Sequence, residues 1–139
     1  MPDRPEPLPR DQFTVKIDGV ETPRIQRLRL PVTTTDQTAD GWGQTRTQDL
    51  VIERVIMDAN PLFYDWRQAV IDDDEAEAKR EVTIEHLDDD RDPVIEWTFE
   101  DAWPKTYRPS SLESGLDDAE NIATEELTLA YESVTREEA

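Results

Sequence analysis

The 139-residue chain is long enough for one folded domain, and its 34 acidic and 15 basic residues give a formal net charge of −19. A surface this acidic argues against general nucleic-acid binding, which needs basic patches, and the absence of cysteine excludes disulfides and thiolate metal sites. Leu, Ile, Val and Phe make up 30 residues, about 22%, just above the level below which disorder is expected. Four tryptophans and several alternating segments favour a folded, β-rich domain.

The composition also suggests the solvent in which the protein works. Only three of the basic residues are lysines, and the acidic residues are spread along the chain. Such a surface suits a protein that stays soluble in concentrated salt, where charges are screened within about 3 Å at 1 M. We interpret this as a halophilic source, with an ordinary acidic protein as the alternative.

The N-terminal third is predicted to combine an arm, two strands and a polar loop. Residues 1–12 are rich in proline and lack the apolar segment of a signal peptide, so they are expected to form an extended arm. A strand is predicted at 13–17, where apolar and polar residues alternate, and a second at 25–30. Residues 32–48 are polar, with Trp42 between two glycines, and we interpret them as a long loop or hairpin tip.

The middle of the chain predicts a buried strand and then one helix. Residues 50–57 are mostly apolar, so we expect this strand to be covered on both faces. The helix is expected at about residues 61–77, with Asn60 as its N-cap and Pro61 at the first helical position. One apolar stripe follows from the spacing of Leu62, Trp66, Ala69 and Val70.

The C-terminal part again predicts strands. A strand at 81–87 and a turn at 88–93 lead into a strand whose Ile95, Trp97 and Phe99 are expected to point together into the core. We expect a corner at Trp103-Pro104, a loop at 107–116, and a last strand from about 122 to 134.

The predicted domain therefore spans residues 13–135, with a polar tail at 136–139. The order of the elements predicts a mainly β fold: an antiparallel β-sandwich or barrel with one inserted α-helix, at about residues 61–77. Strands, then a helix, then a hairpin do not suit a doubly wound α/β fold.

No residue set typical of catalysis is visible. His86 is the only histidine and is expected to be an ordinary strand residue. The acidic run at 72–75 is expected to be a solvated helix face, and the run at 88–92 a hairpin turn, because neither has the glycine of an ordered calcium loop. Phosphate-loop, nucleophile-elbow and metalloprotease motifs are absent from the sequence. We therefore expect no catalytic residues, no metal site and no cofactor.

The order of these motifs resembles the inner tube proteins of phage tails and contractile injection systems, with their haemolysin-coregulated-protein-like fold. The most specific part is the segment Phe-Glu-Asp-Ala-Trp-Pro at 99–104 with the downstream strand at 126–131. The residues that carry the resemblance are Trp66, Trp97, Phe99, Trp103, Pro104, Tyr107, Glu126, Leu127 and Leu129. The chain departs from the family pattern at 26–28, at Val55 and in a mid-loop with few glycines, so the strand register at 20–55 stays open.

The resemblance implies a structural subunit, not an enzyme. Homo-hexameric rings would stack into a hollow tube with a channel for cargo, and the partners would be a sheath protein, baseplate proteins and terminator or cap proteins. The resemblance also implies assembly in the cytoplasm into a virion-like or released particle. No apolar run approaches the roughly 20 residues of a membrane span, and the acidic surface leads us to expect no sequence-specific nucleic-acid contacts. The implied contacts between subunits and rings are Thr35, Asp40, Gly41, Trp42 and Gly43. The alternatives are a monomeric acidic β domain that binds a small ligand or peptide and, third, a hydrolase.

Overall fold

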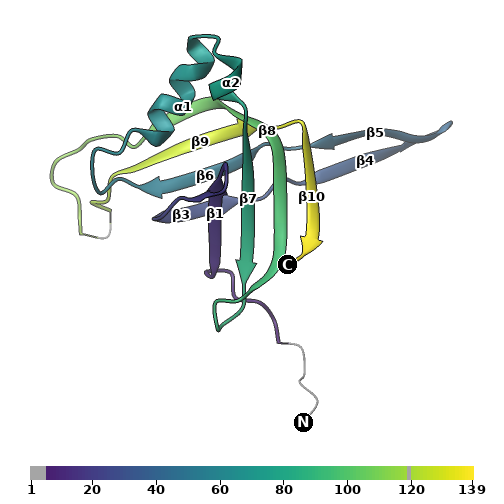
Figure 1. Cartoon of the computed structure of the whole chain (residues 1–139), viewed down its shortest axis with the longest axis horizontal. Coiled ribbons are helices and arrows are strands. Elements are labelled where there is room, and N and C mark those ends of the chain that lie inside the picture. Colours follow the sequence, from purple (N-terminus) through teal and green to yellow (C-terminus); the bar gives the residue numbers. More distant parts are fainter. Residues whose placement is uncertain (1–5, 119) are drawn as a thin grey trace. The chain divides into compact units, whose positions relative to one another are not determined.

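The computed structural model describes residues 6–118 and 120–139, apart from the side chains of residues 36 and 44–46. Residues 1–5 of the expected arm lie outside this part. The predicted mainly β, antiparallel fold with an inserted helical segment is confirmed (Figure 1). The main sheet has eight strands and is open, with the order β2-β1-β7-β8-β9-β6-β3 and β10 paired to β8, while β4 and β5 form a separate hairpin.

The chain divides into two compact units. Unit 1 comprises residues 1–23, 79–102 and 131–139, and unit 2 comprises 24–78 and 103–130. Each combines segments that are far apart in the sequence. The strand β8 (Pro93–Pro109) contributes residues to both.

Unit 1 is an antiparallel sheet with one apolar and one polar face. Its other strands are β1 (Phe13–Ile17), β2 (Val20–Glu21), β7 (Arg80–Leu87) and β10 (Ser133–Glu138). Alternation places Val15 beside Ile84 and Ile17 beside Val82, and all four are buried. Phe99 pairs with Val82 and is also buried. The opposite face is rich in Thr and Glu.

Unit 2 packs a helix on a second set of strands. These are β3 (Ile25–Arg29), β4 (Thr33–Thr38), β5 (Gly41–Thr47), β6 (Leu50–Val55) and β9 (Thr124–Ala130). The fully buried pairs Leu50–Leu129 and Ile52–Leu127 join β6 to β9. The expected coverage of both faces of the third strand is wrong, because buried and half-buried residues alternate along β6.

The helical segment is shorter than expected and is split into α1 (Leu62–Ile71) and α2 (Glu75–Ala78). Pro61 is the geometric N-cap, while the Asn60 side chain accepts a hydrogen bond from the Leu62 N–H at 2.9 Å. The buried face is centred on Phe63 and Trp66, so the predicted stripe omitted Phe63. The Trp66 Nε1–H donates to the Ala78 carbonyl at 2.6 Å, which ties α2 to α1.

The acidic run 72–75 breaks the helical segment instead of lining one helix. Asp72 is the C-cap of α1, and Asp73 has a left-handed φ of 57°. The Asp74 side chain then accepts from the N–H of Glu77 in α2. Short polar side chains compete with helical hydrogen bonds in this way.

Two strand boundaries near the C-terminus differ from expectation. β8 runs through Trp103-Pro104 to Pro109, with a left-handed residue at Asp101 and a register shift after Pro104, and it passes there from unit 1 to unit 2. The loop expected at 107–116 therefore begins only after Pro109. The expected last strand is two strands, β9 and β10, which pair with different halves of β8. Residues 136–138, expected in a polar tail, belong to β10.

A buried ion pair lies on the apolar face of unit 2. Arg54 and Glu125 are paired residues of β6 and β9, and Nε donates to Oε2 at 2.7 Å, with side chains only 8% and 7% exposed. A second guanidinium nitrogen donates to the Asn60 carbonyl at 2.8 Å, and the Tyr107 hydroxyl donates to Glu125 Oε1 at 2.9 Å. The guanidinium also stacks 4.4 Å from the centre of the Phe63 ring. This cluster fixes the chain before α1 to the sheet.

The aromatic residues of β8 contribute unequally to stability. Phe99 is fully buried, 5.0 Å from the Tyr131 ring, whereas Trp97 is half-buried under the Arg136 guanidinium. We expect Phe99→Ala to lower the free energy of unfolding by about 3–5 kcal/mol. Trp97→Ala should cost roughly half of that, because less buried area is lost. Urea denaturation of unassembled protein measures both values, and equal losses would contradict the described packing.

The ion pair should be costly to break but not to replace. Arg54→Met leaves the Glu125 carboxylate buried without its cation, so we expect a loss of about 3–5 kcal/mol in the free energy of unfolding. The double variant Arg54→Met/Glu125→Leu should recover most of that loss, because no charge stays buried. Denaturant titrations of both variants test this. A double variant as unstable as the single one would show that the pair itself provides the stability.

Stability should also fall in alkali through Tyr107. Burial, followed by the hydrogen bond to Glu125, raises the pKa of this phenol to about 12, against about 10 in an unfolded chain. Between these values the unfolded chain loses the proton that the folded chain retains. The stabilisation is therefore complete below pH 10 and is lost as the pH rises towards 12. In Tyr107→Phe, the denaturant midpoint should fall less as the pH rises towards 12 than it does in the wild-type chain. An equal fall in both proteins would refute the attribution of this pH dependence to Tyr107.

Candidate assembly surface

The five residues expected at subunit contacts all lie on the β4–β5 hairpin. Thr35 is in β4, Asp40 is in the turn, and Gly41, Trp42 and Gly43 begin β5. The Trp42 side chain is 81% exposed. Gly41 has a φ of 123°, which favours glycine, and its carbonyl accepts from the Thr38 hydroxyl at 3.1 Å. The turn therefore holds the tryptophan at a defined place near the tip.

The hairpin has little support from the rest of the described chain. Its two strands contact each other extensively and make no comparable contact with another helix or strand. At its base the Gln48 N–H donates to the Val32 carbonyl at 3.0 Å. A two-stranded ribbon on its own is marginally stable in water. Its lack of support from other elements and its exposed Trp42 suit a surface that is completed by another molecule.

The residues that carry the family resemblance mostly lie inside the protein. Trp66, Phe99, Pro104, Leu127 and Leu129 are buried, and Trp97, Trp103, Tyr107 and Glu126 are half-buried. The recognisable sequence signature therefore concerns packing, while the candidate contact surface lies on the β4–β5 hairpin. The roles in assembly of the signature residues and of the hairpin residues stay predictions.

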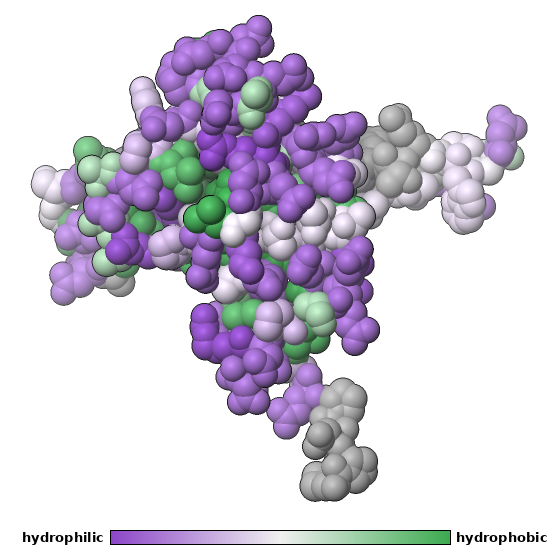
Figure 2. Space-filling view, viewed as in Figure 1, coloured by the Kyte–Doolittle hydropathy of each residue, from purple (hydrophilic) through white to green (hydrophobic). Residues whose placement is uncertain are grey.

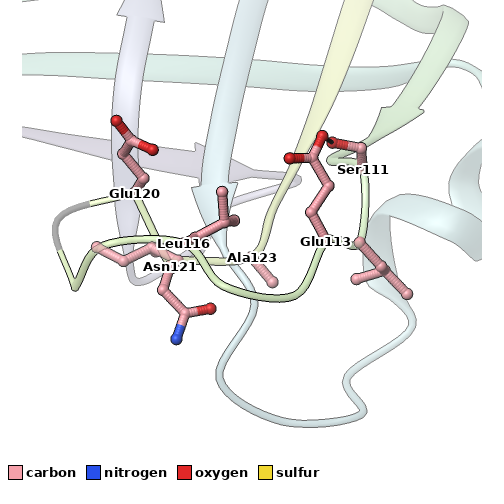
Figure 3. A pocket seen from close by; sticks show the side chains of 8 residues that line it. Ser111, Glu113, Leu116, Glu120, Asn121 and Ala123 are labelled. Atoms are coloured by element: carbon pink, nitrogen blue, oxygen red, sulfur yellow. Dashed lines mark hydrogen bonds between the residues drawn. The ribbon is translucent and has the colours of Figure 1, made fainter.

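A small hollow lies in the connection between β8 and β9, and no pattern in the sequence predicted it. It has a volume of about 110 Å³, and its lining includes the apolar side chains of Leu112, Leu116, Ile122 and Ala123 (Figure 3). Glu113 and Glu120 also line it. Leu112 is 90% exposed and Ile122 is 48% exposed. Ligand pockets usually exceed about 300 Å³, so this hollow is too small for most small-molecule ligands.

Polar residues hold the connection between β6 and α1 in place. Arg24 pairs with Asp58 at 3.0 Å, and Asp58 accepts a further hydrogen bond from the Asn60 N–H at 2.9 Å. The Asn60 N–H, followed by Arg24, lowers the pKa of the Asp58 carboxyl. The carboxylate is therefore ionised at neutral pH and anchors the loop.

Two further carboxylates with shifted pKa values, Glu85 and Glu132, lie in unit 1. On the polar face of unit 1, Glu85 accepts hydrogen bonds from Lys16 Nζ at 3.0 Å and the Thr14 hydroxyl at 2.9 Å. The Lys16 contact is the main cause of a lowered pKa for Glu85. The pKa of Glu132 is raised because its carboxyl shares a hydrogen bond with Asp101. Hydrophilic side chains also dominate the surface in Figure 2.

The acidic run before β8 is a turn, as predicted. One Asp88 carboxylate oxygen accepts from the N–H groups of both Asp90 and Asp92 at 2.9 Å. The three carboxylates approach within 4.8 Å, but their use as turn acceptors explains the cluster. His86 is half-buried, and its Nε2 lies 2.8 Å from the Pro9 carbonyl, so it fastens the arm.

No helix in residues 6–118 and 120–139 is long and apolar enough to cross a membrane.

Comparison with known proteins identifies the family. The model for the T4-like virus tail tube protein gp19 matches residues 9–135. No curated protein sequence matches the chain.

Solved structures have the same fold at low identity. The anti-feeding prophage tube terminating cap is 17% identical, with a TM-score of 0.75 over 100% of this chain and 96% of that chain. A chain of the PVC extracellular contractile injection system sheath–tube complex is 19% identical, with a TM-score of 0.71 over 96% and 93%. Hcp1 from Flavobacterium johnsoniae is 14% identical, with a TM-score of 0.66 over 92% and 96%. Because the family model covers most of the sequence, this chain belongs to the family of the T4-like virus tail tube protein gp19, and it is a structural tube subunit rather than an enzyme.

Proposed function

We propose that the chain forms homo-hexameric rings that stack into the inner tube of a contractile injection system or phage-tail-like particle. The observation that carries this proposal is the unsupported β4–β5 hairpin with its 81% exposed Trp42. An exposed tryptophan is costly in a monomer, whereas aromatic residues are frequent anchors of protein interfaces. The hairpin is therefore proposed to contact the neighbouring ring through Thr35, Asp40, Gly41, Trp42 and Gly43.

The open sheet is consistent with assembly. The strand path ends at β2 and at β3, so edge strands are left for pairing. Exposed edges are a liability in a monomer, and neighbouring subunits can cover them. Repeated head-to-tail contacts give closed rings in one direction and an open filament in another.

The partners are proposed by analogy with the similar structures. One of those structures is a sheath–tube complex, another is a tube-terminating cap, and a third is a baseplate. We infer that this chain meets the same classes of partner, in a virion-like or released particle, and that cargo can pass through the channel of the tube.

Assembly is the direct test of this function. Purified protein in several molar salt should form rings of about six subunits, or stacked tubes, because the hairpin needs a neighbouring surface. Size-exclusion chromatography followed by negative-stain microscopy measures this. A strictly monomeric species at high protein concentration would contradict the proposal.

Assembly should also depend on salt. Six chains, each with a formal charge of −19, give a ring charge of −114. Repulsion on this scale opposes assembly unless it is screened, which is also the basis for proposing a halophilic host. Tubes or rings should loosen when molar salt is diluted, as measured by light scattering. Rings that are equally stable at both extremes would remove the argument for a halophilic source.

A further inference from the structure

We propose that Asp40, at the turn of the β4–β5 hairpin, is a site of spontaneous aspartate isomerisation in chains that have not assembled. The sequence contains two Asp-Gly pairs, Asp18-Gly19 and Asp40-Gly41. A glycine after the aspartate favours this rearrangement, because it has no Cβ to obstruct the approach of the carboxyl group to the backbone nitrogen. The structure distinguishes the two pairs, because it holds the first in place and leaves the second exposed.

The reaction needs only the aspartate, the next residue and water. The Gly41 nitrogen attacks Cγ of Asp40 to form a C–N bond, and the N–H proton leaves with the carboxyl hydroxyl as one water molecule. Water then opens the resulting succinimide ring at either carbonyl. Opening at Cγ restores aspartate, whereas opening at the main-chain carbonyl gives isoaspartate, whose backbone runs through Cβ and Cγ. Mass and formal charge are the same before and after.

The Asp18-Gly19 turn is restrained by a neighbouring strand. Its φ values, 51° for Asp18 and 80° for Gly19, are those of a type I′ turn, which suits a two-residue hairpin loop. The Asp18 N–H donates to the Glu81 carbonyl at 2.8 Å, and the Glu81 N–H donates to Asp18 Oδ1 at 3.0 Å. Because β1 also pairs with β7 from residue 13 to residue 17, rotation of this carboxylate towards the Gly19 nitrogen has to break bonds of the main sheet.

The Asp40-Gly41 pair has much weaker restraints. Asp40 is an exposed turn residue, and no described residue donates a hydrogen bond to its carboxylate. The hairpin makes no extensive contact with another described helix or strand, and its pairing is irregular between Thr35 and Gln37. Such a ribbon is marginally stable and opens locally at a low free-energy cost. Apart from the adjoining residues, no heavy atom lies within 4 Å of the place that a Cβ of Gly41 would occupy. The ring can therefore close more readily here than at Asp18.

The product would alter the hairpin at its proposed contact. Isoaspartate lengthens the backbone by one atom directly before the pairs Gly41–Thr38 and Trp42–Gln37. The register of a hairpin depends on the length of its turn, so the added atom should displace Trp42 and impair stacking. This effect on assembly, unlike the modification itself, rests on the proposed function. In a stacked tube the neighbouring ring would cover the turn, so the reaction concerns unassembled chains.

Peptide mapping tests the modification with an internal control. Trypsin releases Asp18 in a peptide of residues 17–24 and Asp40 in a peptide of residues 30–46, so one digest measures both sites. After prolonged incubation of dispersed protein in low salt, electron-transfer fragmentation should find at least about tenfold more isoaspartate at residue 40 than at residue 18. In urea the two amounts should agree within about twofold, because the restraints on residue 18 are lost.

Two results would overturn the modification. One is equal isoaspartate at residues 18 and 40 in folded, dispersed protein, and the other is a tenfold difference that persists in urea. Asp40→Glu assigns the residue, because a glutamate would have to close a six-membered ring, which forms far more slowly. The isomer in the peptide of residues 30–46 should therefore disappear in this variant, and its persistence would place the reaction elsewhere.

Sedimentation tests the effect on assembly without a variant. Aged wild-type protein is brought to molar salt, the tubes are pelleted, and the pellet and the supernatant are digested separately. Isoaspartate at residue 40 should be severalfold enriched in the supernatant, whereas the small amount at residue 18 should be equal in both. Equal amounts at residue 40 would overturn the effect on assembly. Failure of fresh protein to form tubes would overturn the proposed function, while the digest of dispersed protein still decides the modification.

Discussion

The ion pair between Arg54 and Glu125 is the constraint on which the rest of unit 2 depends. Two charges in an apolar face have a large desolvation cost, and they are tolerated only when every polar group around them is paired. Here Asn60 and Tyr107 complete the pairing, and no described buried side-chain nitrogen or oxygen lacks a hydrogen-bond partner. A slip of one residue between β6 and β9 would separate the charges. The pair therefore specifies the strand register and the start of α1 together.

This register has a consequence for assembly. Fixing β6 against β9 also fixes the chain at both ends of β6, where the β4–β5 hairpin ends and where the connection between β8 and β9 is attached through Ile56. A tube needs identical spacing at every contact, because errors accumulate along a filament. A short strand held between fully buried Leu–Leu and Ile–Leu pairs is a stiff spacer for this purpose. The buried ion pair of unit 2 thus matters more for fixing the strand register than for adding stability.

Sequence patterns predicted the features that depend on neighbouring residues and missed those that depend on distant partners. Alternation located β1, β7 and β9, and the tryptophan between two glycines located the tip of the β4–β5 hairpin. The break between β9 and β10 was missed, because the turn is held by the Glu132 N–H donating to the distant Glu100 carbonyl. The sequence did contain a signal for the buried ion pair, because the charged Arg54 follows Leu50 and Ile52 on the same face of one strand. The hollow gave none, because irregular loop residues form it.

The acidic composition limits which interactions can hold such a tube together. Several of the few cations are already engaged within the chain, since Arg54 pairs with Glu125, Lys16 with Glu85, and Lys105 with Asp49. Because 15 basic residues face 34 acidic ones, ion pairs between copies cannot offset the charge of −19 that each copy carries. Exposed ion pairs would also be weak in the concentrated salt that screens the repulsion. Burial of apolar surface is the interaction that salt strengthens, so an exposed apolar side chain such as Trp42 is the kind of contact that this composition favours.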